Sequence, residues 1–276
     1  MITIENLDFA YSKQKVFENI NLSFEEGCIY GLLGQNGVGK TTLLKLITGL
    51  QNADKGRCII DGKIPFEREP DFLEDIFFLP EEVIAPSDST PERYVKTTGM
   101  FYPNYDHELF VSLMDEMNVD RNKKFEHLSY GQQKKAMFAI ALSLKTKYLL
   151  LDEPTNGLDI PSKADFRKIL AKACTENTTV IISTHQVKDV ENLIDSIVIL
   201  DHDNVLLNAS TQEISQKLYF SFDNEKNDEA IYSEMMPGGF INVSLNQGEF
   251  ESNILVEPLF NAAINNKSLF KKIFDN

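Results

Sequence analysis

The segment that most constrains this chain is residues 34–41, which reads Gly-Gln-Asn-Gly-Val-Gly-Lys-Thr. Two glycines separated by four residues and followed by lysine and a hydroxyl residue form the phosphate-binding loop pattern. An apolar run at residues 28–33 precedes the loop and predicts a buried strand. Residues 42–49 follow it with apolar side chains at helical spacing and a closing glycine. The segment therefore has the strand, loop and helix context that supports the motif.

The residue types in this loop suit the binding of phosphate groups. Its glycines let consecutive backbone N–H groups turn into one concavity, and the following helix adds the positive end of its dipole. Lys40 can reach the outer phosphates of a nucleotide, and the Thr41 hydroxyl can bind Mg²⁺. The loop residues that we expect to contact the nucleotide are Gly34, Gln35, Asn36, Gly37, Val38, Gly39, Lys40, Thr41 and Thr42.

Apolar runs of strand length alternate with helical patterns along most of the chain. Strands are expected at residues 2–9, 16–24, 28–33, 58–62, 75–79, 147–151, 178–183, 196–200 and 205–207, the last two as a hairpin that turns at residues 203–204. Helices are expected at residues 42–49, 129–144, 161–173 and 186–194. This alternation predicts an α/β fold with a mainly parallel sheet. The first strands lack helices between them, so an antiparallel β piece should flank that sheet.

Two further regions differ from this pattern. Residues 89–119 are rich in Tyr, Met, Phe and Glu and predict helices, so we expect an inserted helical subdomain at about residues 85–145. After residue 217 the pattern weakens to short strands at 219–222 and 240–245 and short helices at 255–265 and 269–274. The expected organisation is one nucleotide-binding domain at residues 1–217 and a small accessory region at residues 218–276.

Charge and composition exclude several classes of protein. The formal net charge of −15 disfavours a nucleic-acid binder and direct docking on anionic lipid. No stretch approaches the roughly 20 apolar residues that span a bilayer, and residues 1–5 lack a signal peptide pattern. Cys28, Cys58 and Cys174 have no metal-ligand spacing, and the first two lie in apolar runs as expected core thiols. A soluble, cytoplasmic protein without direct membrane insertion is expected.

Four more residues could complete a nucleotide hydrolase. Asp152 ends an apolar strand and can hold the Mg²⁺ shell, and Glu153 is placed to deprotonate an attacking water. His185 ends the next strand and could contact the terminal phosphate. Tyr11 offers a flat ring on which adenine could stack, although the residues alone favour an ordinary half-buried aromatic at a strand end.

Together these residues resemble the ATP-binding subunits of ABC transporters over residues 1–215. The family signature Leu-Ser-Gly-Gly-Gln stands at residues 128–132 as Leu-Ser-Tyr-Gly-Gln, and the D-loop stands at residues 156–159. The resemblance implies the P-loop NTPase fold and ATP hydrolysis, with Mg²⁺ as cofactor. It also implies that two chains, as a homodimer or heterodimer, sandwich each ATP between one phosphate loop and the other chain's signature. The additional residues implied at the nucleotide are Ser129, Gly131, Gln132 and Asp159.

Two positions depart from the family pattern. Tyr130 replaces the first signature glycine, so its side chain must point away from the phosphate. Glu81 stands at the Q-loop position in place of glutamine, where a carboxylate can still ligate Mg²⁺ or hold a water. Glutamate there resembles some exporter-type members, and the segment that follows resembles stand-alone ATPase subunits of ABC-2 exporters.

The leading hypothesis is therefore an ATPase subunit that powers export through a separate membrane permease, which would hold it on the cytoplasmic face of the plasma membrane. The alternative is a soluble ABC ATPase of an assembly complex, such as an iron–sulfur assembly ATPase. A catalytically silent ATP-binding regulator is disfavoured, because Lys40, Asp152, Glu153 and His185 are all present.

Overall fold

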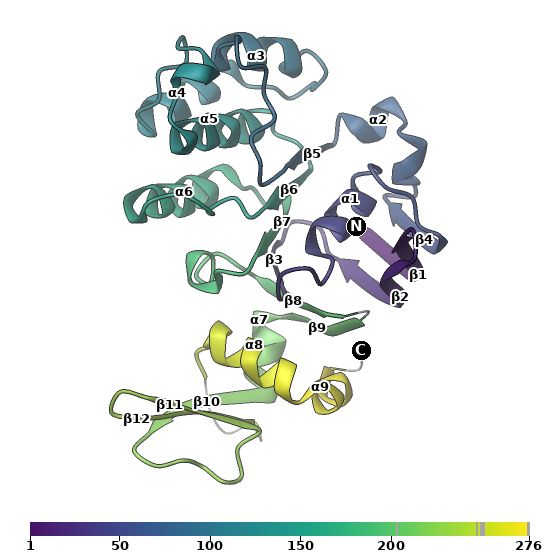
Figure 1. The fold of residues 1–276 in the computed structure, drawn as a ribbon, viewed down its shortest axis with the longest axis vertical. Coiled ribbons are helices and arrows are strands. Elements are labelled where there is room, and N and C mark those ends of the chain that lie inside the picture. The colour runs from purple at the N-terminus through teal and green to yellow at the C-terminus, as the bar shows by residue number, and fades with distance from the viewer. Residues whose placement is uncertain (203, 247, 249–251, 275–276) are drawn as a thin grey trace.

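A six-stranded sheet forms the centre of the molecule, as the computed structural model shows for the described residues 1–202, 204–246, 248 and 252–274 (Figure 1). Its order is β5 (Ile76–Leu79), β6 (Tyr148–Asp152), β7 (Thr179–Thr184), β3 (Ile29–Leu33), β8 (Ser196–Asp201) and β9 (Asn204–Ser210). The first five strands are parallel, and β9 returns antiparallel to β8. Every residue of β6, β7 and β8 is buried, which explains their nearly continuous apolar sequences. The predicted α/β class and mainly parallel sheet are confirmed.

A second, antiparallel sheet packs beside the first, as the absence of helices between the early strands predicts. Its order is β2 (Gln14–Phe24), β1 (Ile2–Tyr11) and β4 (Lys55–Ile60). Helix α1 (Lys40–Ile47) lies between the two sheets and shares a core with both, including Phe17, Leu43 and Leu150. Gly49, with a φ of +69°, ends this helix in the left-handed conformation that glycine adopts readily. This packing fixes the start of α1, where the phosphate-binding loop meets the helix.

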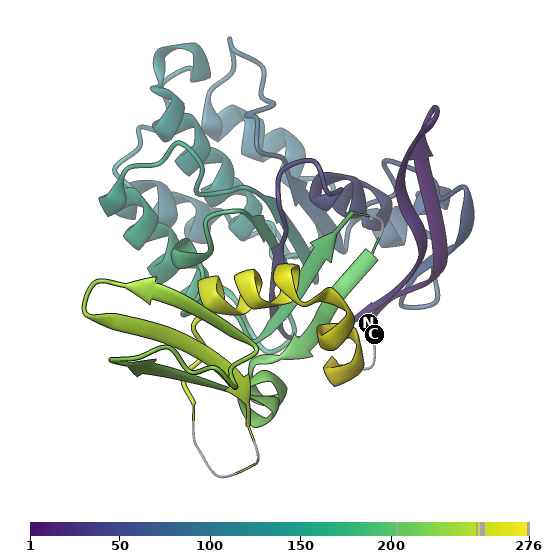
Figure 2. The same ribbon diagram turned by 60° about the horizontal axis from the view of Figure 1, so that its bottom comes forward.

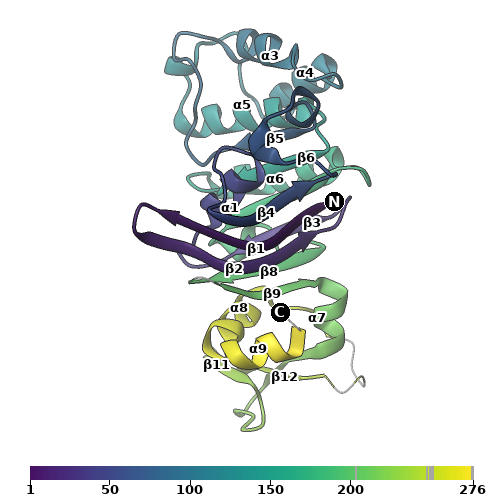
Figure 3. The same cartoon turned by 90° about the vertical axis from the view of Figure 1, so that its right-hand side faces the viewer.

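The helices α3 (Pro91–Gly99), α4 (His107–Glu116) and α5 (Tyr130–Ser143) form one end of the molecule, while α6 (Ile160–Ala173) packs beside the sheet (Figures 1 and 3). A polar side chain caps the first turn of each of the three end helices, and these capping residues are Thr90, Asp106 and Ser129. The helices predicted from the texture of residues 89–119 are therefore present.

The C-terminal region occupies the opposite end of the molecule (Figures 1 and 3). After α7 (Thr211–Lys217) it forms a sheet of β10 (Leu218–Asp223), β12 (Gly239–Leu245) and β11 (Tyr232–Met236), in that order. Helices α8 (Val256–Asn265) and α9 (Lys267–Phe274) lie against β8 and β9 (Figure 2). Leu259 and Phe270 are fully buried in the same core as the central strands. The region thus shares a hydrophobic core with the rest of the chain.

Several local predictions were wrong. Residues 186–194 form only the 3₁₀ turn η3 (Val187–Asp189), because Asp195 ties the chain to the start of β3, where its backbone N–H donates to the Ile29 carbonyl and its carboxylate accepts from the Ile29 N–H. The first hairpin turns at residues 12–13, so β2 begins at Gln14, two residues before the expected start of that strand at residue 16. Cys28 is only half-buried. The predicted turn at residue 203 lies outside the described residues.

Other elements were not anticipated. They are the short turns η1 (Pro65–Glu67), α2 (Pro70–Leu73) and η2 (Phe125–His127), together with α7 and β11. Each is short or lacks a periodic apolar pattern, so its structure depends on packing against neighbouring elements. Within the described part of the chain, no helix has both the length and the apolar character required to cross a bilayer.

Candidate active site

The phosphate-binding loop connects the end of β3 to the start of α1 and curls around the Lys40 side chain. Gly39 has a φ of +107°, and a Cβ there would lie only 2.7 Å from Phe17 Cζ, so no side chain fits at this position. Lys40 Nζ donates to the carbonyl oxygens of Gly34 at 2.8 Å and Gln35 at 3.3 Å. Val38 is buried in the core, so it can face the concavity only through its backbone. The loop thus has the cradle geometry that its sequence predicts.

The end of β6 places Asp152 beside the first turn of α1. Thr41 Oγ1 donates to Asp152 Oδ2 at 2.7 Å. The other carboxylate oxygen, Oδ1, accepts a short hydrogen bond from Ser183 Oγ at the end of the neighbouring strand β7. Asp152 is only 3% exposed, so its carboxylate is oriented from two sides within the protein.

Glu153, the next residue, forms a cluster with His185 and Lys40. Its Oε1 lies 2.8 Å from His185 Nδ1 and 3.7 Å from Lys40 Nζ. Glu153 is buried, whereas the His185 side chain is 37% exposed and reaches the solvent side of the cluster. Burial lowers the pKa of the Lys40 ammonium, while the carboxylates of Glu153 and Asp152 raise it. Four residues therefore meet at one edge of the sheet. They are Asp152 and Glu153 at the end of β6, His185 just after β7, and Lys40 at the start of α1.

These groups face a cleft of about 520 Å³ at the carboxyl ends of the parallel strands, where ligands bind in open α/β sheets. Tyr11 lies at the cleft and is 43% exposed, with its ring 4.9 Å from that of Phe9 in an edge arrangement. The residues that line the cleft are Tyr11, Gln14, Val16, Asn36, Gly37, Gly39, Lys40, Thr41, Thr42, Glu81, Glu153, Asn156 and His185. Most of the predicted site residues are thus brought together.

Glu81 lines this cleft and is bound to the loop after Glu153. Its Oε1 accepts a 2.6 Å hydrogen bond from Asn156 Nδ2, and its backbone carbonyl accepts from Tyr130 OH at 3.4 Å. The Tyr130 ring also packs on Gly157. It lies so close that a Cβ atom added to Gly157 would be 3.1 Å from the ring. The two departures from the family pattern are therefore in contact with each other and with the same loop.

The four residues that the resemblance implies at the nucleotide lie at the starts of α5 and α6, outside the cleft of their own chain. Ser129 caps α5, where its Oγ accepts from Gln132 N at 3.3 Å and Gln132 Oε1 accepts from Ser129 N at 3.0 Å. Asp159 caps α6 through a 3.0 Å bond from Ser162 N. Gly131 lies in the first turn of α5. Among the residues that the structure describes, these four are absent from the lining of the cleft that contains the phosphate loop.

Three residues at the site were missed by the sequence analysis. Ser183 and Asn156 were predicted only as parts of a strand and of the D-loop, and the sequence predicted no role for Lys134. Lys134 and Lys135 are adjacent in the same helix. They differ in burial, since Lys134 is buried and Lys135 is partly exposed. Ser183 could have been predicted from its place, because it is a polar residue near the carboxyl end of a parallel strand, where ligands bind.

The oxygen atoms of Thr41 and Asp152 are the candidate ligands for a metal ion in the cleft. Among the residues that the structure describes, no group of three or more His, Cys, Asp or Glu side chains could hold a metal by itself. Magnesium usually retains several waters and uses one or two carboxylates together with substrate phosphates. The Thr41–Asp152 pair, next to the phosphate cradle, fits that pattern.

A phosphate cradle followed by a helix, with carboxylates on a neighbouring parallel strand, defines the class of nucleotide-hydrolysing P-loop proteins. The family model described as ABC transporter matches residues 17–156. An ABC transporter ATP-binding protein of Bacillus subtilis, YtrB, is 30% identical over 232 residues, covering 82% of this chain and 79% of the relative. The lantibiotic transport ATP-binding protein SrtF of Streptococcus pyogenes is 29% identical, covering 82% of this chain and 97% of the relative.

Solved structures share the fold. An ATP-binding subunit of an ABC transporter superposes with a TM-score of 0.71 at 24% identity, over 78% of this chain and 91% of that one. A dimeric ATP-binding cassette bound to ADP and phosphate gives 0.67 at 23% identity, over 76% and 98%. The chain belongs to the ABC transporter family: it is an ATP-binding subunit and an ATPase.

Proposed function

We propose that this subunit powers export through a separate membrane permease, and that ATP is hydrolysed in the cleft beside Glu153. The observation that carries the hydrolytic part is the Glu153 carboxylate, which lies 2.8 Å from His185 and 3.7 Å from Lys40. These groups stand next to the Thr41–Asp152 pair. A base, two cationic or polar groups and a metal-binding pair are what phosphoryl transfer to water requires.

Each residue has a distinct role in this proposal. Lys40 and the loop N–H groups neutralise the phosphates, and the Tyr11 ring stacks on adenine. Thr41, Asp152 and Glu81 hold magnesium, which neutralises charge on the phosphate oxygens when bound. Glu153 accepts a proton from the attacking water while the water oxygen bonds to the terminal phosphorus and the bond to ADP breaks. His185 orients the Glu153 carboxylate and contacts the terminal phosphate.

Two chains are needed to complete the site. Ser129, Gly131, Gln132 and Asp159 lie outside their own cleft, at the first turns of α5 and α6. The first turn of a helix offers unpaired N–H groups and a positive dipole end to a phosphate. In a homodimer or heterodimer, these turns would face the phosphate loop of the partner. The dimeric cassette bound to ADP and phosphate, similar in fold, supports this arrangement.

A separate groove of about 620 Å³ is the proposed docking place for the permease. It lies between the β5 region and the end of α3, and Met100 and Phe101 at its rim are 74% and 70% exposed. Exposed apolar side chains around a groove commonly mark a protein contact. Such a contact would hold the subunit on the cytoplasmic face of the plasma membrane.

We propose export because Glu81 and the segment after it resemble those of exporter-type members of the ABC transporter family. The names of the relatives give no common direction, since SrtF is named for lantibiotic transport without a direction and CbiO of Salmonella is named for cobalt import. We further propose that residues 1–217 are the ATP-binding domain, with a helical subdomain at about 85–145, and that 218–276 are accessory. All residues that line the cleft precede residue 217.

The permease is tested by affinity purification of the tagged chain from detergent-solubilised native cells, with partners identified by mass. We expect a polytopic membrane protein that is lost in Phe101→Glu and retained in Met235→Glu. Met235 is a matched control, because it is 74% exposed on β11 at the other end of the molecule. Recovery of soluble partners alone would overturn transport and favour the assembly-complex alternative.

A further inference from the structure

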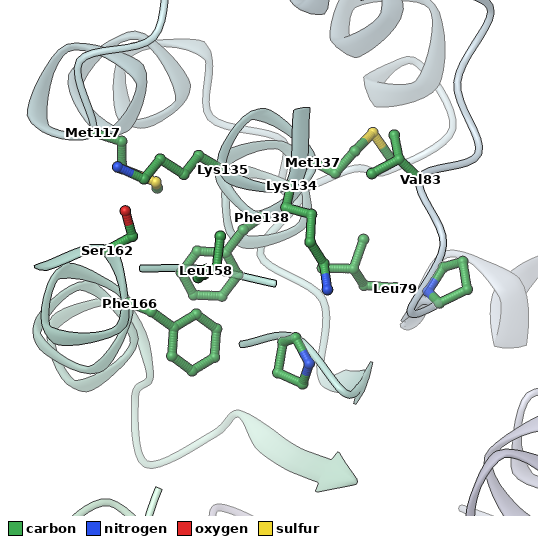
Figure 4. Close-up of a pocket in the computed structure, with 12 residues that line it drawn as sticks. Leu79, Val83, Met117, Lys134, Lys135, Met137, Phe138, Leu158, Ser162 and Phe166 are labelled. Carbon is green, nitrogen blue, oxygen red and sulfur yellow. The ribbon is translucent and has the colours of Figure 1, made fainter. Parts of the chain in front are cut away.

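Lys134 is a buried cation that the hydrolytic residues above do not include. It lies on α5 and is only 7% exposed. Figure 4 shows its side chain pointing from α5 toward the loop that follows β6, among Leu79, Phe138 and Leu158. Burying an ammonium group costs free energy unless its donors are satisfied, so its hydrogen bonds indicate what it does.

The Lys134 ammonium holds the backbone of the loop that carries Glu153. Its Nζ donates to the carbonyl oxygen of Glu153 at 3.1 Å and to that of Asn156 at 2.8 Å. Within the described ranges, the carboxylates of Glu81, Glu153 and Asp152 act on this nitrogen through their charge and not through a hydrogen bond. Its direct partners are therefore the two backbone carbonyls that bracket Pro154 and Thr155.

Glu153 needs such support because its backbone is in a sparsely populated conformation. Its φ of +44° lies in the left-handed region, which costs a non-glycine residue of the order of 1 kcal/mol or more. Its N–H donates to the Ser183 carbonyl on β7 at 3.0 Å, and its carbonyl accepts from Lys134 on α5. The two peptide groups of Glu153 are thus fixed by different elements.

The first turn of α5 packs on the same loop through a neighbouring side chain. The Lys134 nitrogen lies 5.7 Å from the centre of the Tyr130 ring, and this ring covers Gly157. Asn156, whose carbonyl Lys134 holds, also donates to Glu81. The helix that carries the signature therefore contacts the loop after Glu153 at several points within one chain.

We propose that Lys134 is a positioning residue for ATP hydrolysis, which fixes the Glu153 backbone and links the carboxylate's position to that of helix α5. This inference rests on the proposed role of Glu153 as the base. Lys134 acts through the loop backbone, so its loss should impair the chemical step more than nucleotide binding.

The test compares Lys134→Met with Lys135→Met in steady-state ATP hydrolysis. Methionine retains the apolar stem but cannot donate to the two carbonyls. Figure 4 shows Lys135 pointing away from Lys134, toward Met117 and Ser162, so it is the matched control. We expect Lys134→Met to lower kcat by between about tenfold and a hundredfold, because small displacements of reacting groups have effects of this size. KM should change by less than about twofold, and Lys135→Met should resemble the parent.

Rescue distinguishes positioning from general support of the fold. Lys134→Gln has an amide that can donate to a carbonyl, so its kcat should lie between those of the parent and Lys134→Met. If Lys134→Met does not fold, Lys134→Gln is the variant that tests the proposal. A Lys134→Gln protein with the kcat and KM of the parent would then overturn it. In a Glu153→Gln background, Lys134→Met should cause less than about a twofold further loss, because both changes act on one step.

The inference would also be overturned by equal losses in Lys134→Met and Lys135→Met, by a rise in KM without a fall in kcat, or by full additivity with Glu153→Gln. If Glu153→Gln itself remains active, the proposed role of Glu153 fails. If Glu153→Gln is inactive but Lys134→Met hydrolyses ATP like the parent, only the inference about Lys134 fails.

Discussion

The Thr41 hydroxyl donates a 2.7 Å hydrogen bond to Asp152 Oδ2 across 111 positions of sequence. Thr41 lies in the first turn of α1, which follows β3 and the phosphate loop. Asp152 ends β6, which is separated from β3 by β7 in the central sheet. Because the carboxyl ends of parallel strands meet at one edge, the pair lies beside the phosphate cradle. The predictions below test the chemistry assigned to this edge.

Glu153→Gln should lower the rate of ATP hydrolysis by about 10²–10⁴-fold, the usual contribution of a general base. The amide retains the shape of the side chain, so ATP binding should persist and the ATP-bound dimer should accumulate. Phosphate release and gel filtration with ATP measure both effects. Glu191→Gln, at an exposed carboxylate, is the control. A variant that stays monomeric with ATP would contradict the two-chain site.

Lys40→Ala should weaken ATP binding by about tenfold or more, because a hydrogen bond to a charged group contributes about 1.5–3 kcal/mol. Titration with a fluorescent ATP analogue measures the dissociation constant. Lys45→Ala, one turn further along α1, controls for the loss of a positive charge near the loop. Equal affinities of Lys40→Ala and the parent would mean that the loop does not bind phosphate.

Glu81→Gln should lower KM for ATP at saturating Mg²⁺, because it removes a negative charge from the wall of the cleft. It should also raise the Mg²⁺ concentration that hydrolysis needs, because a neutral amide is a weaker magnesium ligand than a carboxylate. The glutamine oxygen can still accept from Asn156, so the loop contact should remain. A reduction in repulsion of about 1 kcal/mol corresponds to about a fivefold lower KM. Steady-state hydrolysis over a range of ATP and Mg²⁺ concentrations measures it. Unchanged hydrolysis in both titrations would place Glu81 outside the functional site.

Asp106→Asn should destabilise the protein at neutral pH but not in acid. The hydrogen bond from Lys145 and the backbone N–H of Leu109 lower the pKa of the Asp106 carboxyl. A carboxyl with a lowered pKa stabilises the fold above its unfolded value of 3.8, and this contribution is lost as the pH falls through the folded pKa. Asparagine still caps α4, so only the charge is removed. The difference in Tm between the two proteins should therefore vanish below the folded pKa, whereas a difference that persists there would indicate a lost cap.

Phe270→Ala should lower the free energy of unfolding by about 3–5 kcal/mol, the usual cost of removing a buried phenylalanine side chain. Phe270 is fully buried in the core that the C-terminal helices share with β9. Urea unfolding measures the change. Phe222→Ala is the control, because Phe222 is 57% exposed on β10. A small effect at Phe270 would show that residues 218–276 contribute little to the stability of the whole chain.

The local sequence determined the phosphate loop, the parallel sheet and the flanking antiparallel strands. These features depend on neighbouring residues: glycines that allow one turn, apolar runs that fill a buried strand, and a helix that follows the loop. The residues Asp152, Glu153 and His185 could be placed at one edge because each ends a strand, and parallel strands end together.

Only the tertiary structure decided which side chains near that edge are paired. Lys134 and Lys135 are adjacent in sequence, yet Lys134 is buried and holds two carbonyls of a loop that begins 19 residues later. Similarly, residues 186–194 have a helical apolar pattern, but the attachment of Asp195 to β3 prevents a helix. Such contacts join residues distant in sequence, and their free energies depend on burial, which the local pattern does not contain.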